Sequence, residues 1–79
     1  MRIDKFLKNS RLIKRRTVAK EACDKERITV NGKTAKPGTE VKEGDIIKIV
    51  FGSSEVTVRV KQLIDSSKKD DAAEMYEIV

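Results

Sequence analysis

Eight of the first twenty residues are lysine or arginine, whereas only one of the twenty, Asp4, is acidic. The eight are Arg2, Lys5, Lys8, Arg11, Lys14, Arg15, Arg16 and Lys20. Ammonium and guanidinium groups bind phosphate oxygens, and arginine can hold two of these oxygens at once with its planar fork. Because apolar residues separate the charges at helical spacing, the cations belong to a folded surface. Such a surface favours binding of a polyanion, above all nucleic acid.

Lys14, Arg15, Arg16 and Lys20 form the sharpest part of this pattern. If a helix begins near Arg16, then Arg16 and Lys20 lie one turn apart on the same face. Cations at a helix start oppose the macrodipole, and a phosphate docked at that end would offset the cost. The alternative interpretation is a solvated face or a short targeting signal. Eight basic residues in two adjacent helices and their connection weaken that alternative.

Catalytic chemistry finds little support in the remaining residues. The chain has no histidine, and its one cysteine, Cys23, lies on an apolar helical stripe, where a small core residue is expected rather than a nucleophile. The acidic residues are scattered over turns, and the four glycines belong to four separate turns rather than to a phosphate loop. We therefore predict a protein that is not an enzyme, with no catalytic residue, metal ligand or cofactor.

The net positive charge comes from the N-terminal third. Residues 1–27 carry ten basic and four acidic residues, a net charge of +6, whereas residues 28–79 carry eight and nine, a net charge of −1. Seventy-nine residues allow one modest core, so a single domain over residues 1–79 is expected. No apolar run approaches the roughly 20 residues of a membrane span, and the N-terminus lacks a signal-peptide pattern. These features predict a cytoplasmic protein without membrane contact.

Two short helices are predicted to carry the basic residues. Ile3, Phe6 and Leu7 form the apolar stripe of a helix that starts near Asp4 as its N-cap and ends at residues 9–10. Thr17 is the expected cap of a second helix. Its apolar face is Val18, Ala19, Ala22 and Cys23.

Strands follow the helices. The pattern predicts strands at 28–30, 46–51 and 56–60, and the Asn31-Gly32 pair predicts a tight hairpin turn after the first. In the tail, a capping box from Ser67 to Asp70 and a helical turn are expected to precede a final strand at 75–79. The fold class is thus α+β, with two short N-terminal helices packed on a small antiparallel sheet.

The type of nucleic acid follows from the scarcity of aromatic residues. Phe6 and Phe51 fall on apolar patterns and are assigned to the core, so stacking of single-stranded bases is not expected. Recognition of structured RNA through phosphates and 2′-hydroxyls fits the composition better. A helix in a DNA major groove stays open, although Lys20, Glu21, Asp24 and Lys25 do not make a persuasive base-reading face.

Several motifs in the chain also resemble those of a known RNA-binding family. Arg2-Ile3-Asp4-Lys5-Phe6-Leu7, Arg11, Arg16-Thr17-Val18-Ala19-Lys20, Ile28-Thr29-Val30-Asn31-Gly32, Val41 and Gly44-Asp45 resemble the S-four domain, the RNA-binding domain named for ribosomal small-subunit protein four. Over the whole length, with Lys68-Lys69-Asp70-Asp71-Ala72-Ala73-Glu74-Met75-Tyr76 near the end, the chain is similar to the RqcP (YabO) family, whose members are related to the fifteen-kilodalton heat-shock protein. The resemblance implies an S-four fold (the alpha-L RNA-binding motif), with a core motif at about residues 2–60 and a C-terminal extension at 61–79.

The resemblance also implies a function. Members of the family act in ribosome-associated quality control: they bind an obstructed large ribosomal subunit, contact its ribosomal RNA and peptidyl-tRNA, and support alanine tailing of the stalled chain by the partner RqcH. Carried over by position, Arg2 and Arg16 are the main expected RNA contacts. Supporting phosphate contacts are expected from Lys5, Lys8, Arg11, Lys14, Arg15 and Lys20. Asp4 is expected to cap the helix and orient Arg2, and the protein is expected to be a monomer.

One departure from the family and two alternatives stay open at this point. Family members usually carry glycine where this chain has Glu26, which predicts a different end for the second helix. The first alternative is a heat-shock-type factor that recycles blocked large subunits without tailing. The second is an accessory RNA-binding domain of an RNA-modifying enzyme such as a pseudouridine synthase.

Overall fold

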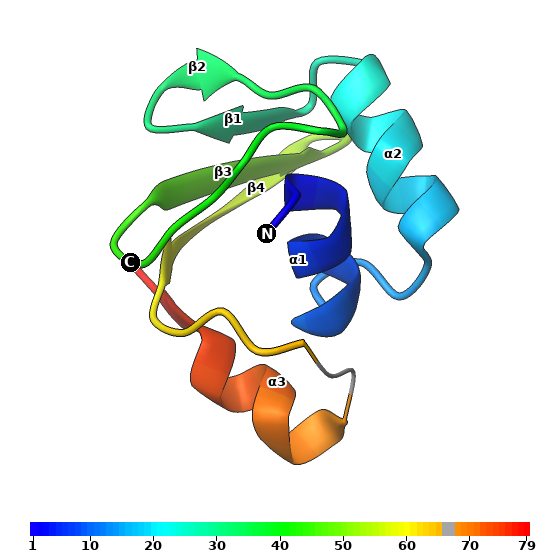
Figure 1. Ribbon diagram of the computed structural model, residues 1–79. Coiled ribbons are helices and arrows are strands. Elements are labelled where there is room, and N and C mark those ends of the chain that lie inside the picture. Colours follow the sequence, from blue (N-terminus) through cyan, green and yellow to red (C-terminus); the bar gives the residue numbers. More distant parts are fainter. Residues whose placement is uncertain (66–67) are drawn as a thin grey trace.

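The computed structural model describes residues 1–65 and 68–79 and has the predicted α+β architecture. The helices are α1 (Ile3–Asn9), α2 (Arg16–Asp24) and α3 (Lys69–Met75). The strands are β1 (Ile28–Val30), β2 (Lys33–Thr34), β3 (Ile46–Phe51), β4 (Ser54–Val60) and β5 (Tyr76–Ile78). In Figure 1, α1 and α2 stand together on one side of the sheet, and α3 lies beyond the end of α1. Within the described residues, no helix is both long and apolar enough to cross a membrane.

The five strands form one antiparallel sheet in the order β2-β1-β3-β4-β5. Its two faces differ because side chains alternate along each strand. Ile47 and Ile49 of β3 are buried under the helices, whereas Lys48 between them is exposed on the open face. The helix-facing side chains join the stripe Ile3, Phe6 and Leu7 of α1 in one apolar core. The predicted packing of the helix pair on one sheet face is confirmed.

The hairpin between β1 and β2 has the predicted turn. Asn31 and Gly32 both have positive φ, 53° and 82°, and Val30 pairs directly with Lys33. Positive φ at both central residues is typical of the type I′ turn, which matches the twist of the flanking strands. The Asn31 side chain also accepts a hydrogen bond from the backbone N–H of Ile46 at 2.9 Å, which fixes the turn against β3.

Both predicted helix caps are wrong. Helix α1 begins at Ile3 with Arg2 as its N-cap, so Asp4 is already the second helical residue. The N–H groups of Ile3 and Asp4 donate instead to carbonyls of Thr39 and Pro37, at 2.7 and 3.4 Å. A loop distant in sequence therefore replaces a local cap. Helix α2 likewise begins before Thr17, with Arg15 as N-cap and no capping side chain.

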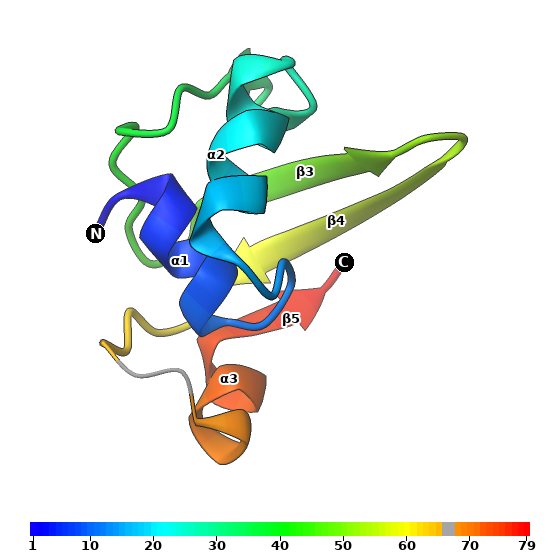
Figure 2. The same cartoon turned by 90° about the vertical axis from the view of Figure 1, so that its right-hand side faces the viewer.

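Two residues assigned to the core are half exposed. Phe51 is 44% exposed and Val18 is 45% exposed, whereas Phe6, Ala19 and Cys23 are buried as predicted. Phe51 has the same parity as the buried Ile47 and Ile49, but it stands at the end of β3. Figure 2 shows the reason, because the β3–β4 hairpin extends past the helices that cover the rest of the sheet.

The C-terminal segment folds back on the sheet as helix and strand. Helix α3 and strand β5 are both present, although Met75 ends the helix rather than starting the strand. Met75 is fully buried, and its carbonyl accepts the N–H of Lys61 at 2.8 Å. The predicted capping box depends on Ser67, which lies outside the described residues.

The end of α2 contradicts the expectation drawn from Glu26. Glu26 has a φ of 60°, which is the left-handed conformation that glycine usually supplies after a helix. Its N–H donates to the carbonyl of Cys23 at 3.0 Å, and the N–H of Arg27 donates to that of Ala22 at 2.9 Å. This pair of bonds is the Schellman motif. The helix therefore ends as it would with glycine, and Glu26 carries the backbone strain.

Replacement of this residue by glycine should stabilise the protein. We expect Glu26→Gly to raise the free energy of unfolding by about 1 kcal/mol, because a left-handed L-residue costs roughly 1–2 kcal/mol and glycine loses part of that gain to chain entropy. Urea denaturation followed by circular dichroism measures the change. Lys25→Gly is the matched control, since Lys25 has a φ of −90°. The control variant should be no more stable than wild type, and a Glu26→Gly variant that is less stable than wild type would contradict the strain.

Candidate nucleic-acid interface

A shallow hollow lies between the start of α1 and the first turns of α2. It has a volume of about 240 Å³ and is lined by Arg2, Asp4, Arg16, Thr17 and Lys20. Helix α2 begins at Arg16, so Arg16 and Lys20 project one turn apart toward it, as predicted. The hollow therefore combines three cations with a hydroxyl near the free N–H groups of a helix start.

Asp4 organises the two arginines of this hollow. Its carboxylate lies 3.2 Å from Nη2 of Arg2 and 3.5 Å from Nε of Arg16. The Asp4 side chain is only 2% exposed, whereas those of Arg2 and Arg16 are 47% and 48% exposed. The other carboxylate oxygen accepts the backbone N–H of Lys5 at 2.8 Å, which holds the acid in place. A fixed, buried anion thus anchors two arginines whose side chains are each about half exposed to solvent.

The predicted orientation of Arg2 by Asp4 is present, and a contact that sequence reasoning missed accompanies it. Arg16 lies twelve residues further along the chain, and no local spacing links it to Asp4. Thr17 was also assigned only as a cap, whereas its side chain lines the hollow. The position of Thr17 directly after Arg16, in the first turn of the helix, was the available signal for this contact.

The other predicted contacts lie around the hollow rather than in it. Lys5 pairs with Asp65 at 2.8 Å, which directs its ammonium toward the C-terminal segment. Lys8 is half-buried in the last turn of α1. Arg11, Lys14 and Arg15 are exposed on the connection between the helices. Three of the eight basic residues thus line the hollow, and the other five lie outside it.

Cys23 is a core residue, as the sequence predicts. It is buried, and burial is the largest cause that raises its thiol pKa from 9.0 to about 11. The charges of Asp4 and Asp24 raise the pKa further. The thiolate that a nucleophile requires is therefore strongly disfavoured near neutral pH.

This burial can be tested by alkylation. At pH 8 we expect iodoacetamide to modify Cys23 about a hundredfold more slowly in the native protein than in urea, because a pKa two units higher leaves about a hundredfold less thiolate. The native rate should rise with pH well above 9. Mass spectrometry of timed samples measures both rates. Equal rates in the two states would show that the thiol is accessible and ordinary.

The fold and the hollow together define a class of protein, the small basic binding module, and comparisons with known proteins agree. The family model "S4 domain" matches residues 1–47, more than half of the chain, so the chain belongs to the S-four domain family. The structure of Heat Shock Protein 15 from Vibrio cholerae, described as trimeric, superimposes with a TM-score of 0.92 at 28% identity. That match covers 100% of this chain and 81% of the other.

Relatives of higher sequence identity show which family within this class the chain belongs to. A protein of Listeria monocytogenes named RQC P-site tRNA stabilizing factor is 60% identical, with 100% of this chain and 86% of the relative covered. A Bacillus subtilis protein of the same name is 56% identical, with 100% and 92% covered. The chain therefore belongs to the family of RQC P-site tRNA stabilizing factors, the RqcP family that the sequence resembles. A Heat shock protein 15 homolog of Aeromonas salmonicida is more distant, at 32% identity.

Proposed function

We propose that this protein is a binding factor of ribosome-associated quality control, without enzymatic activity. It binds RNA of an obstructed large ribosomal subunit, contacts ribosomal RNA and peptidyl-tRNA, and holds the tRNA in a geometry that permits RqcH-dependent alanine tailing. The observation that carries the proposal is the pair of arginines on the buried Asp4, with Lys20 completing a cationic hollow. Family membership supplies the ribosomal setting.

The mechanism that we propose is electrostatic positioning. Two arginines held by one carboxylate present several N–H donors in a fixed arrangement, so less side-chain entropy is lost when they bind phosphates. Lys5, Lys8, Arg11, Lys14 and Arg15 would add phosphate contacts along the border of the hollow. RNA recognised in this way is read by the shape of its backbone rather than by base edges. We propose that the factor acts as a monomer in the cytoplasm.

A binding assay tests this function directly. Large subunits that carry peptidyl-tRNA and empty large subunits are each centrifuged through sucrose with the purified protein. We expect co-sedimentation with the blocked subunits and much less with the empty ones. Equal binding to both would contradict tRNA recognition, and binding to neither would contradict the ribosomal role.

The salt dependence of binding is a second prediction. If about six phosphate contacts form, the logarithm of the association constant should fall against the logarithm of salt concentration with a slope of roughly −4 to −5. Binding of the purified protein to blocked subunits between low and physiological salt measures it. A flat response would contradict the phosphate contacts.

The alternative of subunit recycling without tailing has support of its own, since the fold is also that of Vibrio cholerae Heat Shock Protein 15. The higher identity of the RQC P-site tRNA stabilizing factors favours the tailing role, 60% against 32%. A deletion strain separates the two. Loss of alanine tails from stalled chains supports the proposal, whereas normal tails with accumulated blocked subunits support recycling.

A further inference from the structure

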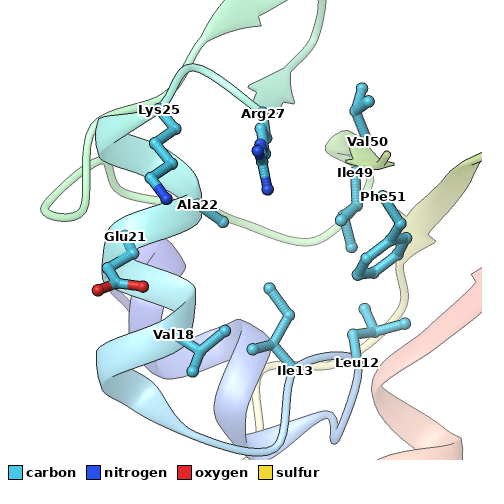
Figure 3. Close-up of a pocket in the computed structure, with 10 residues that line it drawn as sticks. All are labelled: Leu12, Ile13, Val18, Glu21, Ala22, Lys25, Arg27, Ile49, Val50 and Phe51. Carbon is cyan, nitrogen blue, oxygen red and sulfur yellow. The ribbon is translucent and has the colours of Figure 1, made fainter. Parts of the chain in front are cut away.

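An apolar groove lies on a different side of α2 from the basic hollow. It has a volume of about 170 Å³, and Figure 3 shows side chains from α2, from the connection before it and from β3 gathered around it. The lining residues are Leu12, Ile13, Val18, Glu21, Ala22, Lys25, Arg27, Ile49, Val50 and Phe51. The two half-exposed side chains that leave the predicted core, Val18 and Phe51, are both part of it.

The groove and the hollow lie on opposite faces of α2. Residues advance by about 100° each around a helix, which places Val18 of α2 and Lys25, its C-cap residue, roughly opposite Arg16. Arg16 and Lys20 line the hollow, whereas Val18 and Lys25 line the groove. A ligand in the groove therefore need not displace RNA from the hollow.

The charges around the groove are arranged asymmetrically. Figure 3 shows Lys25 and Arg27 at one end, with Arg27 pointing into the groove, and Leu12, Ile13 and Val18 at the other end. The Glu21 carboxylate is directed to the outer side of the helix. Among residues 1–65 and 68–79, neither Lys25 nor Arg27 belongs to an ion pair. One end of the groove is thus complementary to an apolar side chain and the other to a carboxylate.

We propose that the groove is the docking site of a protein partner, which inserts one large apolar side chain from an amphipathic helix. An aspartate or glutamate one turn away on that helix pairs with Lys25 and Arg27, since residues three or four apart share a helix face. A nucleobase fits less well, because most of the lining side chains are aliphatic and Phe51 is the only aromatic one among them. The proposal goes beyond RNA binding and does not depend on it.

Photo-crosslinking in cells that accumulate stalled ribosomes tests the site. The full chain carries p-benzoylphenylalanine in place of Phe51, and a control chain carries it in place of Ile78, which is apolar and 68% exposed on β5. We expect position 51 to give a protein adduct that resists ribonuclease and is absent at position 78. The attached partner peptide should contain an acidic residue three or four positions from the crosslinked apolar residue.

Charge reversal tests the specificity of that adduct. Lys25→Glu together with Arg27→Glu should lower the crosslink yield at least tenfold, and replacement of the partner's acidic residue by lysine should restore it. Circular dichroism checks that the reversed chain is folded. A ribonuclease-sensitive adduct, an adduct to another copy of the chain, a yield unchanged by charge reversal, or no protein adduct at position 51 would each overturn the proposal.

Discussion

Arg16→Ala should abolish detectable co-sedimentation of the protein with blocked large subunits while leaving the fold intact. Arg16 is 48% exposed, so its removal costs little packing, and Asp4 keeps Arg2 as its remaining partner. The lost donors are charged, and hydrogen bonds to charged groups contribute about 2 kcal/mol each, which corresponds to about thirtyfold in affinity. Arg2→Ala should have a similar effect, because Arg2 pairs with the same carboxylate and lines the same hollow.

Arg59→Ala is the matched control for this experiment. Arg59 is also half exposed, at 50%, and it is also ion-paired, with Glu77 at 2.7 Å. It lies on the open face of the sheet, away from the helices, because its neighbours Val58 and Val60 are buried beneath them. The control variant has the same loss of net charge, so it should bind blocked subunits nearly as well as wild type.

The comparison separates a positioned site from a general surplus of charge. Equal losses in Arg16→Ala and Arg59→Ala would mean that net charge alone drives binding. Wild-type binding by Arg16→Ala would mean that the contact face is assigned wrongly. Arg16→Lys adds a further step, since a lysine keeps the charge but lacks the planar fork. We expect it to recover only part of the affinity.

Local patterns in the sequence predict most of the fold. The apolar stripe Ile3, Phe6 and Leu7 specifies α1, and Asn31-Gly32 specifies the β1–β2 hairpin. Each of these elements is determined by residues that lie only a few positions apart in the sequence. The basic residues of the hollow were also predictable, since Arg16 and Lys20 are one helical turn apart. For such features the physical cause and the sequence signal lie in the same few residues.

Features that depend on distant segments were not predictable in this way. The cap of α1 comes from carbonyls of residues 37 and 39, and the second partner of Asp4 comes from the next helix. The exposure of Phe51 depends on how far the helix layer reaches along β3, which no strand pattern records. The left-handed Glu26 shows the converse, since the fold imposes a conformation that its residue type disfavours.

Asp4→Asn gives the second large effect, and its direction distinguishes positioning from charge. Removal of a negative charge from a phosphate site should strengthen binding if only the electrostatic sum matters. If instead Asp4 acts by holding Arg2 and Arg16, the neutral amide releases both arginines. We then expect binding to blocked subunits to weaken about tenfold, or about 1.4 kcal/mol, although the net charge of the chain rises.

The same substitution should also destabilise the fold. Asparagine keeps an oxygen that can accept the Lys5 N–H, but it loses two charge-assisted contacts of a buried group. A decrease of about 1–2 kcal/mol in the free energy of unfolding is expected, discounted because both arginines are half exposed. Urea denaturation measures this loss and sets the conditions under which the variant is fully folded for the binding assay.

A double-mutant cycle decides whether the two effects act through the arginines. In an Arg2→Ala and Arg16→Ala background, Asp4→Asn has no guanidinium left to release, so it should no longer weaken the residual RNA binding. Residual binding of these chains is measured at low salt, where weak phosphate contacts are strongest. An equal loss in both backgrounds would mean that Asp4 affects binding through the fold. Tighter binding by Asp4→Asn alone would mean that net charge alone determines affinity. The buried carboxylate would then have a structural role and no part in recognition.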